Sequence, residues 1–208
     1  MKTVLCYGDS NTWGAVPLVS LDDVRRFDIA VRWPGALRER LGAGYWVVEE
    51  GLNGRTTVHD DPVEGEHRNG RTYLRPCLET HAPIDLVILM LGTNDLKHRF
   101  AVTPWDIAAS AGLLIDIIRA STAGVAGNAP RVLLMCPPPL LAGMFTDGRE
   151  KSRALAPHYA AVAEARGCAF VNAGEVIECS EVDGIHFDAE DHVALGTHLA
   201  GRVPGLLA

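Results

Sequence analysis

The sequence lacks a long apolar run and an excess of positive charge. Its longest strongly apolar stretch spans residues 86–91, whereas a helix that crosses a bilayer needs about 20 such residues. Lysine and arginine number 19 against 26 aspartates and glutamates, which gives a formal net charge of -7. We therefore expect no transmembrane segment, no anchoring to an anionic membrane and no nucleic-acid partner.

The sequence also lacks paired cysteines, and this pattern favours free thiols over a disulfide scaffold. The five cysteines are an odd number, and no two of them form a C-x-x-C pair. Such usage is typical of thiols in a reducing compartment. The amino-terminal residues contain no apolar segment of about 7–15 residues, so they do not look like a secretory signal. These absences predict a soluble cytoplasmic protein.

The composition that remains is that of a globular protein. Hydrophobic residues make up 48% and charged residues 22% of the 208 residues, which excludes disorder and coiled coil. A chain of this length buries about 70% of the surface that it exposes when unfolded. We therefore predict a single domain over residues 1–208, with a core that needs no disulfide or structural metal.

Short apolar runs alternate with longer helix-like stretches along the chain. The runs are mostly rich in Val, Ile and Leu without period-2 alternation, which predicts strands buried on both faces, at residues 4–7, 46–48, 86–91, 132–135 and 169–171. The stretches between them predict helices at residues 34–41, 104–120, 150–166 and 189–203. This alternation predicts an α/β fold, in which helices cover both faces of a five-stranded parallel sheet.

Two segments are longer than compact connections need, residues 17–32 and residues 55–83. We expect both to be irregular. Connections of this length are usually lids, binding loops or subunit contacts. For the second segment, a solvated excursion is an equally good interpretation.

Small and polar residues follow the predicted strands. Ser10 follows the first strand, Gly54 the second and Asn94 the third, while Asp183 and His186 precede the last helix. In an open parallel sheet, ligands bind beyond the carboxyl ends of the strands. We therefore expect these five residues to meet at one edge of the sheet.

Ser10, Asp183 and His186 supply the groups of nucleophilic catalysis. A serine hydroxyl needs an adjacent base, usually a histidine whose second ring nitrogen donates to a carboxylate. Each residue alone has a common structural interpretation, Ser10 and Asp183 as helix caps and His186 as a surface residue. Ser10 does not lie in a G-x-S-x-G pattern, so a nucleophile elbow of the α/β-hydrolase type is not supported.

Asn94 and Gly54 supply hydrogen-bond donors. An asparagine amide and a backbone N–H at glycine each stabilise the oxyanion of a tetrahedral intermediate by about 3–4 kcal/mol. Alone, Asn94 also suits a turn that bonds its own backbone, and Gly54 suits a turn with positive φ. The presence of every role at one edge favours catalysis over a set of separate structural coincidences.

Four short motifs resemble the blocks of the SGNH or GDSL-type hydrolases, and they occur in that family's order. They are Gly8-Asp9-Ser10, Asn53-Gly54-Arg55-Thr56, Gly92-Thr93-Asn94-Asp95 and Asp183-Gly184-Ile185-His186. Asn11 stands where the GDSL name has leucine. Nearly the whole chain looks like the bacterial arylesterase/acyltransferase branch, as in Glu49-Glu50-Gly51-Leu52 and Pro137-Pro138-Pro139.

The resemblance implies a flavodoxin-like three-layer α/β/α fold with a serine esterase site. In that site Ser10 is the nucleophile, His186 the base and Asp183 its partner. The backbone N–H groups of Ser10 and Gly54 and the side chain of Asn94 form the oxyanion hole. The resemblance also implies a small-molecule ester substrate, no cofactor, no metal and a homo-oligomer, and some members transfer acyl groups to alcohols.

The substrate that we expect is a short-chain, acetyl-type ester of an aryl or simple alcohol. Acetylated sugars, and lysophospholipids or thioesters, are the alternatives within the family. The expected substrate pocket consists of residues beside the motifs, namely Asp9, Asn11, Trp13, Arg55, Asp95 and Ile185.

Two of these pocket residues have a second interpretation. Trp13 is equally well interpreted as ordinary packing. Arg55 suits either an acidic substrate or pairing with a carboxylate. Ala15 and the segment 140–148 depart from the acyltransferase branch, and we expect both to reshape the acyl or alcohol pocket.

Other residues suggest chemistry that we do not expect. His186, His192 and His198 recur every six residues, and such side chains point apart on a helix, which favours surface histidines over a zinc site. Cys136 is expected to be a buried apolar residue. The pairs Asp60-Asp61 and Glu49-Glu50 are expected to be solvated charges or loop contacts.

The alternative outside catalysis is a flavodoxin-like module that binds a phosphate or nucleotide at the first strand–helix loop. Ser10, Asn11 and Thr12 have donors for a phosphate there. That interpretation gives Asp183 and His186 no functional role.

Overall fold

The computed structural model describes residues 1–20, 22–141, 145 and 148–208. Five parallel strands form one sheet with the order β2-β1-β3-β4-β5. The strands are β1 Lys2–Gly8, β2 Tyr45–Gly51, β3 Leu86–Met90, β4 Arg131–Cys136 and β5 Ala169–Asn172. The predicted five-stranded parallel sheet is confirmed, and its order is that of the flavodoxin-like folds.

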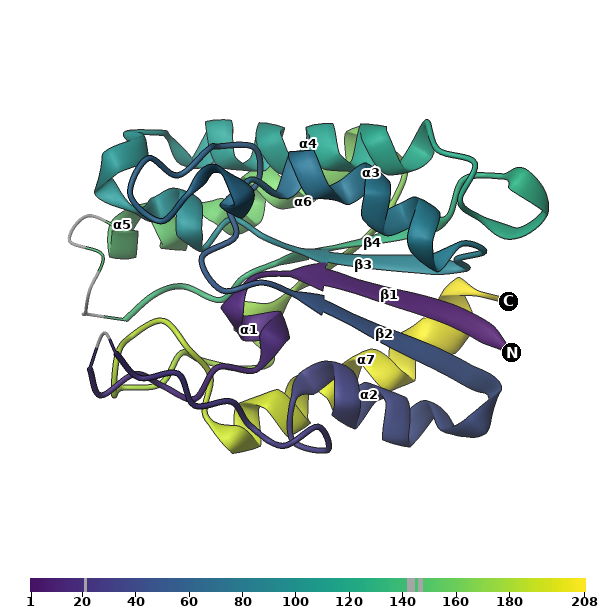
Figure 1. The fold of residues 1–208 in the computed structure, drawn as a ribbon, viewed down its shortest axis with the longest axis horizontal. Helices are drawn as coiled ribbons and strands as arrows, with labels where there is room; N and C mark the ends of the chain where they lie inside the picture. Colours follow the sequence, from purple (N-terminus) through teal and green to yellow (C-terminus); the bar gives the residue numbers. More distant parts are fainter. Residues whose placement is uncertain (21, 142–144, 146–147) are drawn as a thin grey trace.

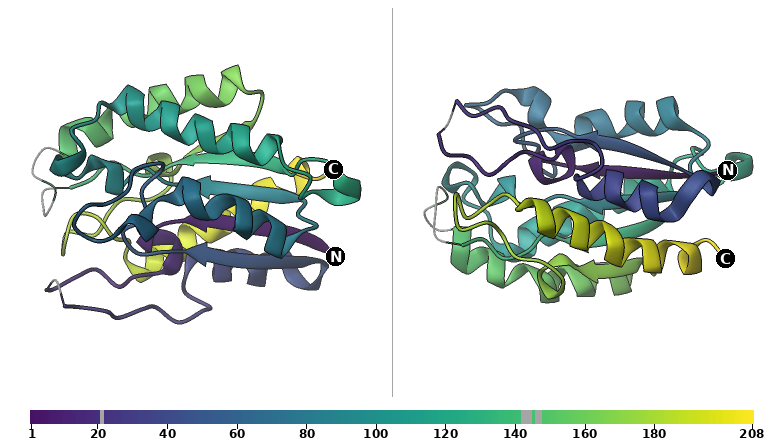
Figure 2. Two further views of the ribbon diagram at one scale, coloured as in Figure 1. Left: turned by 45° about the horizontal axis from the view of Figure 1, so that its top comes forward. Right: turned by 90° about the horizontal axis from the view of Figure 1, so that it is seen from below.

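Helices cover both faces of this sheet (Figure 1). On one face lie α2 (Trp33–Leu41) and α7 (Ala189–Leu206), which run side by side in the view from below (Figure 2). On the other face lie α3 (Gly70–His81), α4 (Pro104–Arg119) and α6 (Leu155–Ala165). The result is the three-layer α/β/α architecture that the resemblance implied.

The core lies on both sides of the three central strands. Every residue of β3 is buried, as are residues 3–8 of β1, because helices cover both of their faces. The edge strands β2 and β5 are mostly half-buried. This gradient explains why the central strands appear in the sequence as continuous apolar runs.

Helix α3 corrects the expectation that residues 55–83 are irregular. The Asn69 side chain accepts a hydrogen bond from the Arg71 N–H at 3.0 Å and caps the helix. Leu74, Cys77 and Leu78 then face the core at helical spacing. Pro76 obscured this pattern, and the helix tolerates it on its exposed side.

The expected helix at residues 150–166 is two helices. They are α5 (Gly148–Arg153) and α6, and they separate at Ala154. Ser152 on α5 accepts a hydrogen bond from the Leu140 N–H at 2.9 Å, so α5 is held against the segment that follows β4. A short helix, α1 (Ser10–Trp13), was also not expected. Residues 17–20 and 22–32 contain no helix or strand, as expected for most of that segment.

The order of the strands places a crevice at one end of the sheet. The connection after β1 leads to β2 on one side, and the chain then returns to β3 on the other side of β1. Ligands of open α/β sheets bind outside the carboxyl ends of the strands at such a reversal. Among the described residues, no helix combines the length and the apolar character needed to cross a bilayer.

Candidate active site

Ser10 lies where β1 passes into α1. Asp9 caps this short helix, because its side chain accepts a hydrogen bond from the Asn11 N–H at 3.0 Å. Gly8 allows α1 to lie close to the sheet, since a Cβ there would be 2.0 Å from the Thr12 hydroxyl oxygen. The Ser10 N–H belongs to the first helical turn, where amides have no acceptor within the helix. Both the hydroxyl and the amide of Ser10 are thereby held at the carboxyl end of β1.

The turn that precedes α7 folds around the Asp183 carboxylate. One carboxylate oxygen accepts the backbone N–H groups of Ile185 and His186, each at 2.9 Å. The other lies 2.6 Å from Nδ1 of the His186 ring. Nε2 of the same ring lies 3.0 Å from the Ser10 Oγ. Residues 10, 183 and 186 therefore form one continuous line of hydrogen bonds, although 176 positions separate its serine from its histidine.

The charge of Asp183 fixes the tautomer of His186. Burial opposes ionisation of this carboxyl group, but hydrogen bonds from the His186 ring and from the Leu18 N–H outweigh it and lower the pKa to about 2. An ionised carboxylate only accepts hydrogen bonds, so Nδ1 of His186 carries the proton. The lone pair of Nε2 then faces the Ser10 hydroxyl, which is the orientation of a general base.

Asn94 and Gly54 lie at the ends of the two neighbouring strands. The Asn94 side-chain amide donates to the Arg55 carbonyl oxygen at 3.1 Å, which fixes its orientation. Gly54 has φ +74° in the turn that the Arg55 N–H closes onto the Leu52 carbonyl at 3.0 Å. A side chain at Gly54 would be strained by this φ, and its Cβ would lie 2.4 Å from a Glu64 carboxylate oxygen.

Ser10, Gly54, Asn94 and His186 all line one cavity of about 700 Å³. Its apolar wall is formed by Trp13, Ala15, Leu18, Val24, Phe145 and Ile185. Its polar wall is formed by Asp23, Arg25, Asn53, Glu64, Lys97, His98 and Arg99. Two of the expected pocket residues, Trp13 and Ile185, are thus in the lining. Ala15 is there too, whereas much of the segment 140–148 lies outside the described residues.

Three other expected pocket residues, Asp9, Asn11 and Asp95, are buried and are not in the described lining. The Asn11 amide donates to the Ile185 carbonyl at 3.1 Å and joins α1 to the turn that carries His186. Asp95 accepts hydrogen bonds from the backbone N–H and the hydroxyl of Thr57. Burial raises the pKa of Asp9 to about 6, and burial also raises the pKa of Asp95. These contacts connect the loops that position the lining residues.

Arg55, the remaining expected pocket residue, is not in the described lining of the Ser10 cavity. Its guanidinium donates to the carbonyl oxygens of Gly8 at 2.8 Å and Glu50 at 2.5 Å. It also lies 4.2 Å from the centre of the Tyr7 ring. The side chain lines a second cavity, of about 580 Å³. Arg55 therefore joins the carboxyl ends of β1 and β2.

A buried ion-pair cluster beside the Ser10 cavity was missed by the sequence analysis. Asp61 is only 1% exposed and lies 2.9 Å from Arg99 and 3.4 Å from Lys97. Glu64 lies 2.5 Å from each of the same two cations. Asp61 is therefore a loop contact and not a solvated charge. No spacing signal joins these residues, because they come from connections that follow different strands.

His192 is another correction, because it is buried and not on the surface. Its ring lies between those of Phe27 and Phe187, at centroid distances of 5.4 and 5.3 Å, and its Nδ1 accepts the Trp33 N–H at 3.3 Å. Burial lowers the pKa of His192 to about 3. Cys136 is buried as expected, and burial raises the pKa of its thiol.

Comparison with known proteins gives one family and a set of close structural neighbours. Residues 6–199 match the model of the GDSL-like lipase/acylhydrolase family. The solved aryl esterase of M. smegmatis is 44% identical over 100% of both chains, with a TM-score of 0.95. A carbohydrate acetylesterase from Sinorhizobium meliloti is 42% identical over 99% of this chain and 100% of that chain, with a TM-score of 0.93. No curated protein sequence matches the chain.

Proposed function

The chain belongs to the GDSL-like lipase/acylhydrolase family, and from this premise we propose that it is a serine esterase that hydrolyses short-chain acyl esters. The observation that carries the proposal is the line of hydrogen bonds from Ser10 through His186 to Asp183. It ends at a cavity that also exposes the Asn94 amide and the Gly54 turn. No cofactor takes part in the steps proposed below.

In the first step the Ser10 Oγ attacks the carbonyl carbon of the ester. The hydroxyl proton passes to Nε2 of His186, 3.0 Å away, as the new C–O bond forms. The His186 ring then carries a positive charge, which the ionised Asp183 at 2.6 Å stabilises. The low pKa of Asp183 ensures that this charge is available throughout the neutral pH range.

The carbonyl oxygen becomes an oxyanion in this step. Its donors are the Asn94 side-chain amide and the backbone N–H groups of Ser10 and Gly54. Each is held before the substrate arrives, Asn94 by the Arg55 carbonyl and Gly54 by its turn. Donors held in advance lose little reorganisation energy when the charge forms, which is why each contributes about 3–4 kcal/mol to the barrier.

Collapse of the tetrahedral intermediate breaks the bond to the alcohol, which takes the proton from His186. Water then attacks the acyl-Ser10 ester, gives its proton to the same Nε2, and releases the carboxylic acid by the reverse sequence. A second alcohol in place of water yields a new ester. Both reactions use the same groups, so the cavity lining decides between hydrolysis and acyl transfer.

The two walls of the cavity suggest the alcohol parts that the enzyme accepts. Trp13, Leu18 and Ile185 present apolar surface that suits an aryl group. Asp23, Arg25 and Glu64 present hydrogen-bonding groups that suit a sugar. The neighbouring solved structures are an aryl esterase and a carbohydrate acetylesterase, which supports the same pair of substrate classes.

Replacement of the nucleophile tests the proposal. Ser10→Ala should lower kcat for p-nitrophenyl acetate by about 10⁴- to 10⁶-fold while the protein remains folded. A fluorophosphonate probe should label the wild-type protein at Ser10, and peptide mass mapping would identify the labelled residue. Ser121→Ala is the matched control, because this hydroxyl bonds the Ile118 carbonyl after α4. Unchanged turnover in Ser10→Ala, or labelling at another residue, would refute the assignment.

The substrate class is tested separately. A series of p-nitrophenyl esters should show kcat/KM falling as the acyl chain lengthens beyond acetate. Phenyl acetate and an acetylated sugar, compared at equal concentration, then report which alcohol is preferred. When methanol or ethanol is added, the acyl-enzyme reacts either with water to give the acid or with the alcohol to give a new ester. The ratio of new ester to acid measures acyl transfer.

A further inference from the structure

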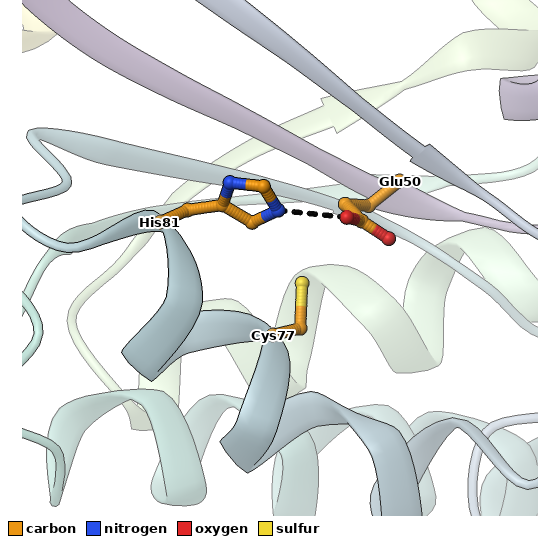
Figure 3. A group of neighbouring side chains, drawn as sticks. All are labelled: Glu50, Cys77 and His81. Carbon is orange, nitrogen blue, oxygen red and sulfur yellow. Dashed lines mark hydrogen bonds and ion pairs between the residues drawn. The ribbon is translucent and has the colours of Figure 1, made fainter.

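A second group of reactive side chains lies away from the Ser10 cavity. Glu50 is near the carboxyl end of β2, while Cys77 and His81 are four residues apart on α3. Figure 3 shows the three side chains pointing toward one another. Their nearest ligand atoms all lie within 4.8 Å of one another. Nε2 of His81 lies 2.7 Å from a Glu50 carboxylate oxygen.

We propose that Glu50, Cys77 and His81 bind one divalent transition-metal ion of the zinc class. The three donors are a sulfur, an imidazole nitrogen and a carboxylate oxygen, which together are a donor set typical of zinc. Mg²⁺ and Ca²⁺ prefer sites built from oxygen donors. The thiolate therefore selects a softer ion such as Zn²⁺ or Co²⁺.

The spacing of the donors suits tetrahedral coordination. Metal–ligand bonds of about 2.0–2.3 Å at tetrahedral angles place ligand atoms about 3.3–3.6 Å apart. The Glu50–His81 contact of 2.7 Å must open slightly, and the remaining separations, up to 4.8 Å, must close by about 1 Å. Side-chain rotation supplies these shifts, since the Glu50 and His81 side chains remain 20% and 17% exposed.

The backbone that carries the donors is already fixed. Cys77 and His81 lie on one face of α3, because residues four apart on a helix are neighbours. Glu50 is paired in the ladder between β2 and β1. An ion at this position would join α3 to the edge strand of the sheet.

A fourth coordination position is available from the neighbouring cavity. Glu50 lines the cavity of about 580 Å³, together with Tyr73 and Pro76 on α3. This cavity gives the ion a route from solvent and leaves room for a coordinated water. Three protein ligands with water at an open fourth position is a known coordination pattern of zinc.

Charge and proton balance are simple at this site. Binding replaces two protons: the Cys77 thiol proton goes to solvent as the metal–sulfur bond forms, and the proton that Nε2 of His81 donates to Glu50 leaves this nitrogen while a proton from solvent occupies Nδ1. No oxidation state changes. The thiolate and the Glu50 carboxylate then neutralise the two charges of the ion.

A cobalt titration of chelator-treated protein tests the proposal directly. One equivalent of Co²⁺ should produce a near-ultraviolet thiolate-to-cobalt charge-transfer band, and Zn²⁺ should abolish it by displacement. Zn²⁺ in large excess over its Kd should also raise Tm by about 5 °C. Absence of the charge-transfer band in wild-type protein would overturn the proposal.

Matched variants identify the ligands. Cys77→Ser should remove the charge-transfer band and weaken Zn²⁺ binding by on the order of 100-fold. Glu50→Gln keeps a side-chain oxygen that accepts from His81, so it should fold normally and weaken binding by about 10-fold. Cys168→Ser is the control, because Cys168 is a half-buried thiol outside the cluster. A band that persists in Cys77→Ser, or that disappears in Cys168→Ser, would contradict this site. Equal Zn²⁺ affinity in wild type and Glu50→Gln would contradict it as well.

Discussion

A nucleophilic side chain, an imidazole and a carboxylate come together twice in this molecule, once at the larger cavity and once beside the smaller one, which Glu50 lines. At the larger one, Asp183 contacts Nδ1 of its histidine and leaves Nε2 facing the Ser10 hydroxyl. At the smaller one, the Glu50 carboxylate contacts Nε2 of His81 instead, at 2.7 Å. The same three functional groups are therefore arranged for proton transfer at Ser10. Around Cys77 they are arranged to bind one ion.

The surroundings of the two nucleophiles differ as well. The Ser10 hydroxyl faces a cavity beside the Asn94 amide. Cys77 is fully buried, and burial, together with the charge of Glu50, raises the pKa of its thiol to about 12 against a smaller opposing effect of Arg55. A thiol with this pKa is protonated at neutral pH and inert as a nucleophile. The comparison teaches that the orientation of the imidazole and the access to the nucleophile determine the chemistry.

The largest expected effect comes from a substitution that disturbs the orientation of the His186 ring. Asp183→Asn replaces an acceptor by a group that also donates, so it favours the wrong tautomer of the ring and removes the charge that stabilises the imidazolium. We expect kcat to fall by about 10⁴-fold with little change in KM. Steady-state kinetics on p-nitrophenyl acetate measure this. Asp116→Asn, which removes a half-exposed partner of Arg166, should retain full activity.

A second experiment compares the two nucleophile positions as thiols. At pH 8 a thiol of pKa about 12 is ionised to only about 1 part in 10⁴. A cysteine at position 10 would adjoin the His186 base and ionise far more readily. In chelator-treated Ser10→Cys protein, we expect iodoacetamide to alkylate residue 10 about 10³-fold faster than Cys77, as followed by peptide mass mapping. Alkylation of Cys77 as fast as that of Cys168 would contradict this picture.

A third experiment removes the Asn94 amide, which lines the larger of the two cavities. Asn94→Ala should lower kcat by about 10²- to 10³-fold, because the amide contributes mainly when the oxyanion forms. KM should change by no more than a few-fold. Asn128→Ala is the matched control, since that exposed amide donates to the nearby Val125 carbonyl at 3.1 Å. A rise in KM with kcat unchanged would show instead that Asn94 binds the substrate in its ground state.

The smallest expected effect concerns a third imidazole, that of the buried His192, which contacts two aromatic rings. Its pKa is about 3 in the folded protein, against about 6.5 in the unfolded chain. Below pH 6.5, His192 therefore binds a proton in the unfolded chain but not in the folded protein. The free energy of unfolding falls as the pH falls. The loss is about 2 kcal/mol between pH 6.5 and pH 5.

The measurement is the difference in unfolding free energy between wild type and His192→Asn at the two pH values. A difference measurement is needed because Asp9, whose pKa is raised by burial to about 6, acts in the opposite direction. Its protonation stabilises the folded state as the pH falls. The same pH slope in wild type and variant would show that His192 is not the titrating group.

The sequence predicted the elements whose pattern is local. Continuous apolar runs marked the central strands because both faces of those strands are covered. Ser10, Asp183 and His186 were predicted to meet because each follows a strand or precedes a helix at the same edge, and the structure brings them together. Helix α3 was missed because Pro76 argues against a helix, although the cap at Asn69 and the spacing of Leu74 and Cys77 were signals for one.

The remaining features depend on contacts between distant segments. Asp61 meets Lys97 and Arg99 only because two loops fold over the same cavity. Likewise, Glu50 meets Cys77 and His81 only because α3 packs beside the end of β2. His192 is buried by Phe27, which lies in an irregular segment without a pattern. The four-residue spacing of Cys77 and His81 is visible in the sequence, but no motif or period connects the partners across these contacts.

The distance of 176 positions between Ser10 and His186 has a consequence for the newly made protein. At about 5–20 residues per second, the ribosome needs roughly 9–35 s to extend the chain from one to the other. During this interval Ser10 and His186 cannot meet, so the proposed esterase site is incomplete on the nascent chain. Under the proposed mechanism, hydrolysis begins only after the turn at residues 183–186 leaves the ribosome and docks beside the first strand.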